Sequence, residues 1–214
     1  MEVPEMTFVE ILKQPIEEFQ KNTAPIILLV LIILVSSVYP SDLENDYSQS
    51  RGGEDIEFVV LTEKYGRHIN TLMPFALAVI SRDKSGLKQI FVIAVSGIVA
   101  SHGPKRFLNN VQILGTRLGQ RPFSSTSKHN TPSGHSTLAG ATAYFVMRRY
   151  SWWFAVIVIP VLLCTMYARV MLDKHTISAT VAGAATGLLV ATLFSTSFSE
   201  FRSHIWHTFR SFIK

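Results

Sequence analysis

The apolar residues of this chain are gathered into long blocks, and this arrangement restricts the possible folds more than any other feature. Charged residues make up only 16% of the 214 residues, against roughly 25% in a soluble globular domain. Blocks of this length are typical of helices that cross a lipid bilayer. We therefore predict an all-α fold, a bundle of six transmembrane helices. The blocks occupy residues 24–39, 68–81 (interrupted by Pro74), 87–101, 136–147, 152–170 and 176–198.

The segments around these blocks suggest three regions. Residues 1–23 mix glutamates with apolar residues, a pattern typical of a short interfacial helix, which we expect Pro15 to break. The block at 24–39 also resembles a secretory signal, but the preceding segment is acidic and no clear small-x-small cleavage site follows, so we expect a retained span. The predicted regions are an interfacial helix at 1–23, a membrane domain at 24–198 and a basic cytoplasmic tail at 199–214.

Basic residues in short loops predict the orientation of the bundle. A net charge of +5 is compatible with nucleic acid or with anionic lipid, and its position between apolar blocks favours a membrane without nucleic acid. Since short cytoplasmic loops carry the excess of Lys and Arg, we expect both termini in the cytoplasm and the loops at 41–67, 102–131 and 171–175 in the periplasm. The basic residues counted are Arg82, Lys84, Lys88, Arg148, Arg149, Arg202, Arg210 and Lys214.

The loop between the third and fourth blocks contradicts this rule. From Pro104 to Gly134 it has no acidic residue, yet it carries several cations on the predicted periplasmic side. Either the topology is inverted, which would put three other basic segments on the wrong side, or these cations face a bound anion. We favour the bound anion. The cations are Lys105, Arg106, Arg117, Arg121 and Lys128.

The peptide at 132–135, Pro-Ser-Gly-His, opens the fourth block at the same face of the membrane. Pro132 is placed like a proline in the first turn of a helix, which would leave the N–H groups of Ser133 and Gly134 free. Because a helix N-terminus attracts negative charge, free N–H groups at this position favour an anion such as phosphate.

Arg169 at the end of the fifth block and His175 at the start of the sixth complete the pattern. Donors fixed around the three equatorial oxygens of a transferred phosphoryl group lower the barrier to its transfer. Arginine suits this role because its planar fork binds two oxygens and remains charged. Two histidines, His135 and His175, are available as nucleophile and proton donor, so the pattern indicates phosphoryl transfer.

These motifs resemble those of a known family. Lys105 with Arg121-Pro122, the peptide at 132–135 and Arg169-x5-His175 are similar to the three signature motifs of the type 2 phosphatidic acid phosphatase superfamily, over residues 100–195. The resemblance implies that His175 attacks phosphorus to form a phosphohistidine, and that His135 protonates the leaving oxygen and then activates water. It implies no metal or other cofactor. The phosphate would be held by Lys105, Arg121, Ser133, Gly134 and Arg169.

Within the superfamily, the peptides starting at Arg117, Met147 and Leu172 are similar to the lipid A 1-phosphatase branch. This implies removal of the 1-phosphate of lipid A at the periplasmic face of a bacterial inner membrane. The alternatives are phosphatidylglycerophosphate or undecaprenyl pyrophosphate as substrate, a lipid phosphotransferase, or a protein that only binds anionic lipid. Binding alone would need cations but not two histidines at separate helix ends. The sequence does not indicate an oligomeric state.

The sequence departs from the family pattern after the nucleophile. The family usually places an aspartate four residues beyond this histidine, where it orients the imidazole ring, and this position is Ala179 here. Asp173, Thr176, Ser178 or a backbone carbonyl are the alternatives for this role.

The first motif also departs from the pattern, because fifteen residues separate Lys105 from Arg121 and the usual gap is shorter. Arg106 and Arg117 are therefore alternatives to Lys105 as phosphate ligands. His129, in the same basic loop, is a candidate for contact with the lipid headgroup. All of these residues lie on the predicted periplasmic side.

Overall fold

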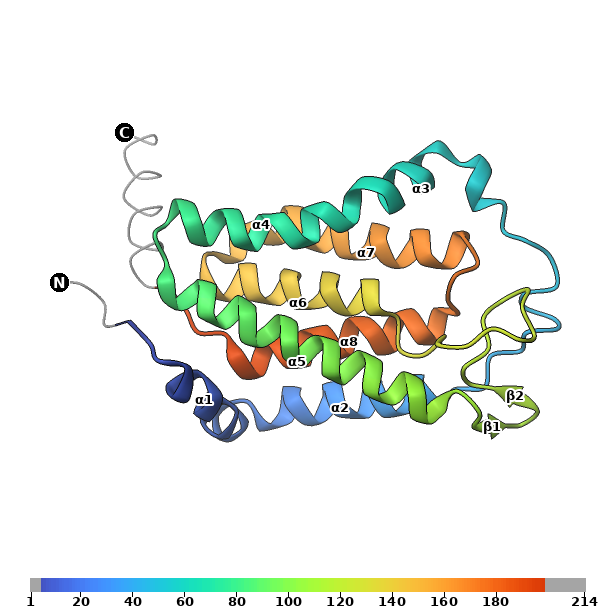
Figure 1. Cartoon of the computed structure of the whole chain (residues 1–214), viewed down its shortest axis with the longest axis horizontal. Helices are drawn as coiled ribbons and strands as arrows, with labels where there is room; N and C mark the ends of the chain where they lie inside the picture. The colour runs from blue at the N-terminus through green and yellow to red at the C-terminus, as the bar shows by residue number, and fades with distance from the viewer. Residues whose placement is uncertain (1–4, 199–214) are drawn as a thin grey trace.

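The computed structural model describes residues 5–198, so the predicted basic tail at 199–214 and the first four residues of the predicted interfacial segment lie outside the described residues. The described chain forms an elongated helical bundle, with loops gathered at one end and a short helix, α1 (Phe8–Lys21), at the other (Figure 1). We refer to these as the loop end and the α1 end. The lengthwise helices are α2 (Thr23–Val38), α4 (Arg67–Ile80), α5 (Lys84–Leu108), α6 (Gly134–Arg149), α7 (Ala155–Met171) and α8 (Ile177–Phe194).

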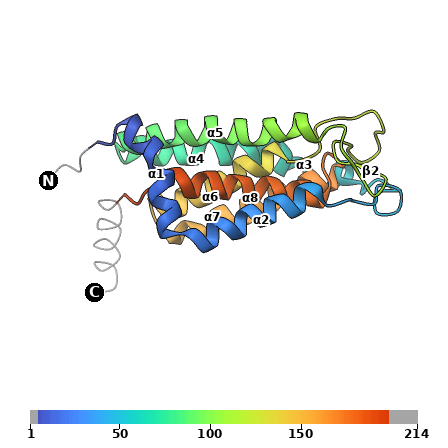
Figure 2. The ribbon, with the colours of Figure 1, turned by 90° about the horizontal axis from the view of Figure 1, so that it is seen from below.

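Helices α6 and α8 lie side by side at the centre of the bundle, with α2, α4, α5 and α7 around them (Figures 1 and 2). Small residues permit their close approach. A Cβ atom on Gly187 would collide with the carbonyl oxygen of Thr137, and one on Gly183 with the carbonyl oxygen of Ser133. This is the small-residue packing typical of membrane helices. The packing also fixes the start of α6 against the first turns of α8.

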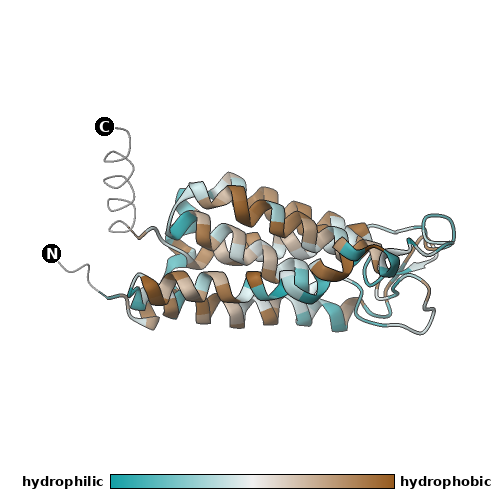
Figure 3. Ribbon diagram, turned by 90° about the horizontal axis from the view of Figure 1, so that it is seen from above, coloured by the Kyte–Doolittle hydropathy of each residue, from teal (hydrophilic) through white to brown (hydrophobic). Residues whose placement is uncertain are grey.

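The outer helices present apolar side chains to their surroundings, with hydrophilic residues concentrated towards the two ends (Figure 3). Among the described residues, α5, α8 and the segment formed by η3 (Trp152–Phe154) with α7 are long and apolar enough to cross a membrane. The pair α1 and α2 also passes this test together, although it is bent by 101°. The all-α prediction is therefore confirmed, and the chain is a multi-span membrane protein.

The prediction of six spans is confirmed only in part, because α4 and α6 have 14 and 16 residues and roughly 20 are needed to cross a bilayer. α4 is extended by α3 (Glu57–Leu61) and η2 (Thr62–Gly66), a π-helical turn, so that residues 57–80 form one helical segment. The prediction that residues 41–67 form only a loop is thus wrong at residues 57–66. A short turn, η1 (Gly53–Asp55), precedes this segment.

Two prolines predicted to interrupt helices lie inside them. Pro74 lies within α4, and Pro15 lies within α1, which runs without a break from Phe8 to Lys21. Thr7 and Glu10 form a capping box that satisfies N–H groups at the start of α1, so the helix tolerates the one hydrogen bond that Pro15 removes. The break predicted near Pro15 instead occurs at Asn22, where the chain turns into α2.

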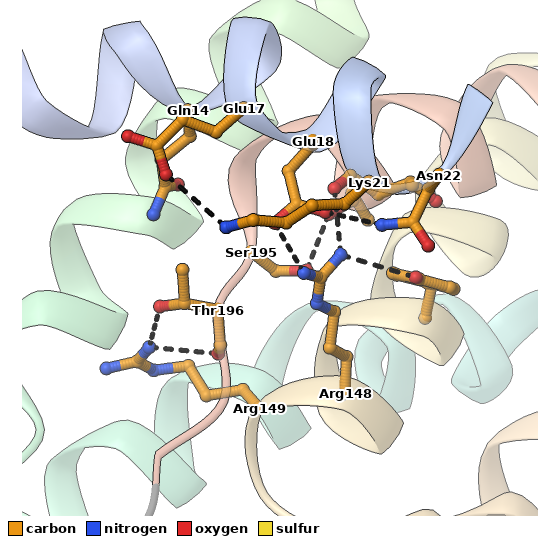
Figure 4. Close-up of polar contacts among 12 residues, drawn as sticks. Gln14, Glu17, Glu18, Lys21, Asn22, Arg148, Arg149, Ser195 and Thr196 are labelled. Atoms are coloured by element: carbon orange, nitrogen blue, oxygen red, sulfur yellow. Dashed lines mark hydrogen bonds and ion pairs between the residues drawn. The ribbon is translucent and has the colours of Figure 1, made fainter. Parts of the chain in front are cut away.

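An ion pair joins α1 to the end of α6 (Figure 4). Nη2 of Arg148 lies 2.7 Å from Oε1 of Glu18, and Nη1 of Arg149 donates to the carbonyl oxygen and the hydroxyl of Thr196. Arg149 also forms a buried ion pair with Asp83. Both arginines were predicted as loop cations, but the structure places them in the last turn of α6 with carboxylate partners.

At the loop end, α5 continues to Leu108, seven residues beyond the predicted boundary, because Pro104 lies inside the helix without ending it. The connection from α5 to α6 contains a hairpin of two short strands, β1 (Gln112–Ile113) and β2 (Thr116–Arg117). The loop end therefore gathers the last turn of α5, this connection, the first turn of α6 and the α7–α8 connection (Figure 1). These are the segments that carry the predicted site.

Candidate active site

His175 is held in the connection between α7 and α8 and is only 2% exposed. Its Nδ1 atom lies 2.7 Å from the carbonyl oxygen of Asn130. Because a carbonyl oxygen only accepts hydrogen bonds, Nδ1 carries the proton when the ring is neutral, and Nε2 holds the lone pair. Of the alternatives for orienting this ring, the structure thus favours a backbone carbonyl.

The surroundings of His175 keep its imidazole neutral. Burial lowers the pKa of His175 well below its usual range, and the positive charges of Arg169, Arg121 and Lys105 lower this pKa further, while the hydrogen bond to Asn130 opposes them. The three cations act on His175 because they lie close enough for their charges to disfavour the imidazolium form. A neutral imidazole at physiological pH is the form that attacks phosphorus.

Asn130 was not predicted as a functional residue, yet it holds the His175 segment at three points. Besides its carbonyl oxygen, its Oδ1 accepts a hydrogen bond from the N–H of Thr176, and its Nδ2 donates to the Thr176 hydroxyl. An asparagine two residues before Pro132 is an ordinary loop residue in sequence terms, so no pattern pointed to it. The hydroxyl of Thr176 is also hydrogen-bonded to that of Ser178. Thr176 therefore helps to hold the segment that carries His175 through its contacts with Asn130.

Asp173 does not orient His175. Its carboxylate accepts hydrogen bonds from the Ser50 hydroxyl and from the backbone N–H and side chain of Arg51. Asp173 therefore ties the α7–α8 connection to the acidic loop before η1. Ala179, where the family places aspartate, is fully buried, and its carbonyl oxygen accepts the N–H of Ser133.

Three buried or half-buried cations surround the pocket. Lys105 is 7% exposed and Arg169 is 6% exposed, and their charges act on each other and on Arg121. In residues 5–198, Arg169 is paired with Glu63, and neither Lys105 nor Arg121 has a carboxylate partner. Nε of Arg121 and Nε of Arg169 are buried without a hydrogen-bond partner. Buried donors left unpaired cost free energy, and an anion could accept hydrogen bonds from both.

Arg121 is fixed by the loop that carries it. Its backbone N–H donates to the Ser127 hydroxyl at 2.8 Å, and Nη2 of its side chain donates to the carbonyl oxygen of His129 at 3.4 Å. Burial lowers the pKa of the Arg121 guanidinium, although arginine still remains charged. The half-buried charge is therefore available to an incoming anion.

The start of α6 differs from the prediction in two details. α6 begins at Gly134 with Ser133 as its N-cap, so Pro132 lies before the helix and not in its first turn. The Ser133 N–H is not free, since it donates to the carbonyl oxygen of Ala179, and the buried Ser133 hydroxyl accepts from Ser136. Gly134 lies beside Lys105, since a Cβ atom there would come into ordinary van der Waals contact with its Nζ at 3.4 Å.

His135, in the first turn of α6, is half-buried and lies within electrostatic range of Arg169, Glu63 and Lys105. Lys105 and Arg169 thus lie within electrostatic range of both histidines, and Arg121 lies within electrostatic range of His175. Each comes from a different segment of the loop end except Arg169 and His175, which the α7–α8 connection links through hydrogen bonds to the Arg169 carbonyl oxygen.

The alternatives to Lys105 lie elsewhere. Arg106 is exposed on the outer face of α5. Arg117 uses its guanidinium to bind three backbone carbonyl oxygens, those of Asn109, Ser125 and Ser127, so it stabilises the loop. His129 is exposed, its backbone N–H donates to Oδ1 of Asn109, and its ring Nδ1 lies 3.3 Å from Nδ2 of the same asparagine. Lys105 therefore fits the phosphate position better than Arg106 or Arg117.

The lowered pKa of His175 predicts a pH dependence of stability. Below the usual value of 6.5, the unfolded chain protonates this histidine and the folded protein does not, so stability falls as pH decreases. At pH 5.5 the loss is about 1 kcal/mol, or about 2–4 °C in Tm. Thermal unfolding in detergent at pH 7.5 and 5.5 should show a smaller drop for His175→Asn than for the wild type. An equal drop in both proteins would contradict the prediction.

Comparison with known proteins identifies the class. Residues 85–203 match the sequence profile of the PAP2 superfamily, and the chain belongs to this superfamily. PAP2 phosphatases are metal-independent phosphomonoesterases, so the chain is a lipid phosphatase whose substrate carries a lipid phosphate.

Two lipid A 1-phosphatases are among the proteins that are similar in sequence. The lipid A 1-phosphatases of two strains of Helicobacter pylori are 42% and 40% identical to this chain over 134 residues, which is 63% of this chain and 69% and 70% of theirs. A crystal structure described as the first transmembrane PAP2 type phosphatidylglycerolphosphate phosphatase from Bacillus subtilis is also similar. It has a TM-score of 0.46 and 15% identity, and it covers 90% of this chain and 97% of that one.

Proposed function

We propose that this protein removes the 1-phosphate of lipid A through a phosphohistidine intermediate. The observation that carries the proposal is the environment of His175, whose ring is buried within electrostatic range of two arginines with buried, unpaired Nε atoms. The similarity to two lipid A 1-phosphatases supports lipid A as the substrate. The 1-phosphate is a monoester on a sugar, and its leaving group is the anomeric oxygen.

In the proposed reaction, Nε2 of His175 attacks phosphorus and the P–N bond forms as the bond from phosphorus to the sugar oxygen breaks. His135 donates its proton to that oxygen, so the anomeric oxygen of lipid A leaves as a neutral hydroxyl group. Water then attacks the phosphohistidine, His135 takes one proton from this water, and inorganic phosphate leaves as the P–N bond breaks. Both histidines return to their starting states.

The cations stabilise the charge that spreads over the equatorial oxygens during each step. Lys105, Arg121 and Arg169 are held before the substrate arrives, so little reorganisation is needed at the moment of reaction. The hydrogen bond from Nδ1 of His175 to the Asn130 carbonyl stabilises the positive charge that develops on the ring as the P–N bond forms. We propose that Gly134 adds a backbone donor, and that Ser133 acts through the helix start that it caps.

An apolar groove supports a lipid as the substrate. It has a volume of about 390 Å³, lies between α4, α5 and α6, and extends from His102 and Gly134 near the pocket to Phe145 deeper in the bundle. Phe75 and Ile98 line it and are exposed on the outer surface, so the groove reaches the lipid-facing side. An acyl chain in this groove would place the headgroup beside the pocket.

The proposal includes an orientation. We propose six spans, in which the neighbouring helices shield the ends of α4 and α6 that are too short to cross the bilayer alone. We also propose that both termini lie in the cytoplasm and that the site lies at the periplasmic face of a bacterial inner membrane. The basic loop from α5 to α6 then faces the periplasm because it binds phosphate. In this arrangement α1, within the proposed segment 1–23, lies along the cytoplasmic interface, 24–198 form the phosphatase domain, and 199–214 a basic tail.

The test is the mass of lipid A before and after incubation with the detergent-purified protein. We expect the loss of one phosphate, with fragmentation placing the remaining phosphate on the non-reducing glucosamine. Phosphatidylglycerophosphate and undecaprenyl pyrophosphate are assayed in parallel, with released phosphate quantified, and a second lipid is added to detect phosphate transfer.

The outcomes separate the possibilities. If lipid A keeps both phosphates while another lipid is hydrolysed, the lipid A assignment is wrong and the PAP2 chemistry stands. If the label of the 1-phosphate appears on an added lipid and not in inorganic phosphate, the protein is a phosphotransferase. Loss of the phosphate on the non-reducing glucosamine would also contradict the proposal.

A further inference from the structure

Glu63 contacts the phosphate-binding machinery although no sequence pattern pointed to it. It lies in the acidic segment predicted as a loop, and the structure places it on η2, the π-helical turn that joins α3 to α4. Its Oε1 atom forms an ion pair with Nη1 of Arg169. The Arg169 side chain is 8% exposed and that of Glu63 is 29% exposed. π-helical turns occur frequently at functional sites, where they redirect a side chain.

The ion pair uses one nitrogen of the Arg169 guanidinium and leaves another nitrogen without a hydrogen-bond partner. Nη1 is bound to Glu63, while Nε is buried without a partner. Since the five N–H donors of arginine lie in one rigid plane, a carboxylate on Nη1 fixes the direction in which the Nε edge points. A free guanidinium at the end of a long side chain would sample several orientations.

The helix that carries Glu63 is itself held against α7. Nδ2 of Asn70 on α4 donates to the hydroxyl of Thr165, one turn before Arg169. Gly66, the last residue of η2, leaves room beside the same threonine. The carboxylate of Glu63 therefore has a fixed support and can transmit its position to Arg169.

The charges indicate that the pair persists when substrate binds. Lys105, Arg121 and Arg169 bring three positive charges and Glu63 one negative charge, and Arg67 adds a further positive charge within electrostatic range of Arg169, so at least two positive charges remain. A phosphate monoester carries a charge of about −1.5 to −2 near pH 7. The substrate can thus be neutralised without displacing Glu63, so this carboxylate need not act as a competing anion.

We propose that Glu63 is a positioning residue that orients the Arg169 guanidinium towards the transferred phosphoryl group. The inference rests on the role proposed for Arg169 and is independent of which lipid is hydrolysed. The site already draws on the end of α5, the α5–α6 connection, the start of α6 and the end of α7 with the α7–α8 connection. Glu63 adds η2 as a fifth segment, and η2 lies outside the three sequence motifs. Because Glu63 acts through Arg169, its main effect falls on the transition state and not on binding of the lipid.

The test compares Glu63→Ala and Glu63→Gln with Glu57→Ala, in detergent, on a lipid phosphate that the wild type hydrolyses. Glu57 is exposed on α3 and is a matched control for loss of one acidic side chain. We expect Glu63→Ala to lower kcat by about 10–100-fold with little change in KM. Glu63→Gln should recover much of this loss, because its amide oxygen still accepts a hydrogen bond from Nη1. Glu57→Ala should resemble the wild type.

Inhibition by orthovanadate supplies a second readout, since its trigonal-bipyramidal adduct resembles the transition state. In Glu63→Ala, the vanadate concentration for half-inhibition should rise by the same factor as kcat/KM falls. A loss of stability alone would change Tm without this proportionality. Unchanged kcat and vanadate inhibition in Glu63→Ala, or tighter vanadate binding, would overturn the inference. Arg169→Ala, measured in parallel, shows which idea fails, because an active Arg169→Ala would contradict the proposed site itself.

Discussion

Replacing His175 by Ala is expected to lower phosphate release by about four to six orders of magnitude, because the reaction loses its nucleophile. The remaining cations still bind phosphate, but they offer no atom that forms a covalent bond to phosphorus. His175→Asn should be equally inactive, although its amide can still donate to the Asn130 carbonyl. Release of inorganic phosphate from the lipid substrate, followed over hours, measures both variants.

Rapid quenching with ³²P-labelled lipid distinguishes loss of the nucleophile from general damage. The wild type should retain label that is stable to alkali and released by acid, as expected of a phosphohistidine, and both His175 variants should not. His68→Asn is a matched control, since His68 is exposed on α4 and outside the predicted motifs. Turnover at the wild-type rate in His175→Ala would end the proposed mechanism.

The position of the motifs in the fold could be predicted because each motif stands at the end of an apolar block, and such boundaries are visible in the sequence. Lys105, His135 and Arg169 lie in terminal turns of helices, at one end of the bundle, as the alternation of spans requires. The same alternation of spans places His175 at this end of the bundle. Their roles in catalysis remain proposals that the experiments above test.

Residues that act through long-range contacts could not be predicted. Asn130 and Glu63 sit in segments without periodicity or motif, and their partners are 45 and 106 residues away in the chain. Local patterns also misled at Pro15 and Pro74, because capping and packing compensate for a missing hydrogen bond. At Ser133, a free N–H was expected from helix geometry, but the close approach of α8 provides the Ala179 carbonyl as its acceptor.

Arg149 illustrates the same limit at the α1 end, where a residue counted as a loop cation is 3% exposed. Its Nη2 lies 2.6 Å from Oδ1 of Asp83, and its Nε pairs with the other carboxylate oxygen. Asp83 also caps the start of α5, accepting the N–H of Gly86 at 2.8 Å, and accepts the hydroxyl of Tyr150. One carboxylate thus joins α5 to the end of α6.

Asp83→Ala is therefore expected to destabilise the protein by about 3–5 kcal/mol, because it leaves the Arg149 guanidinium buried without its counter-charge. Loss of the cap on α5 adds about 1 kcal/mol. Thermal unfolding in detergent should show a Tm lower by roughly 10 °C or more. Below this Tm the turnover number should stay close to that of the wild type, since the turn between α4 and α5 that carries Asp83 lies at the opposite end of the bundle from the loop end (Figure 1).

The double variant Asp83→Leu with Arg149→Met separates the ion pair from the packing around it. Removing both charges leaves neither group unpaired, so the double variant should be more stable than either single variant, which gives a coupling free energy of about 2–3 kcal/mol. Glu17→Ala, which breaks an exposed pair with Lys21, is the control and should change Tm by no more than a degree or two. If Asp83→Ala unfolds at the wild-type Tm, this ion pair does not hold α5 against α6.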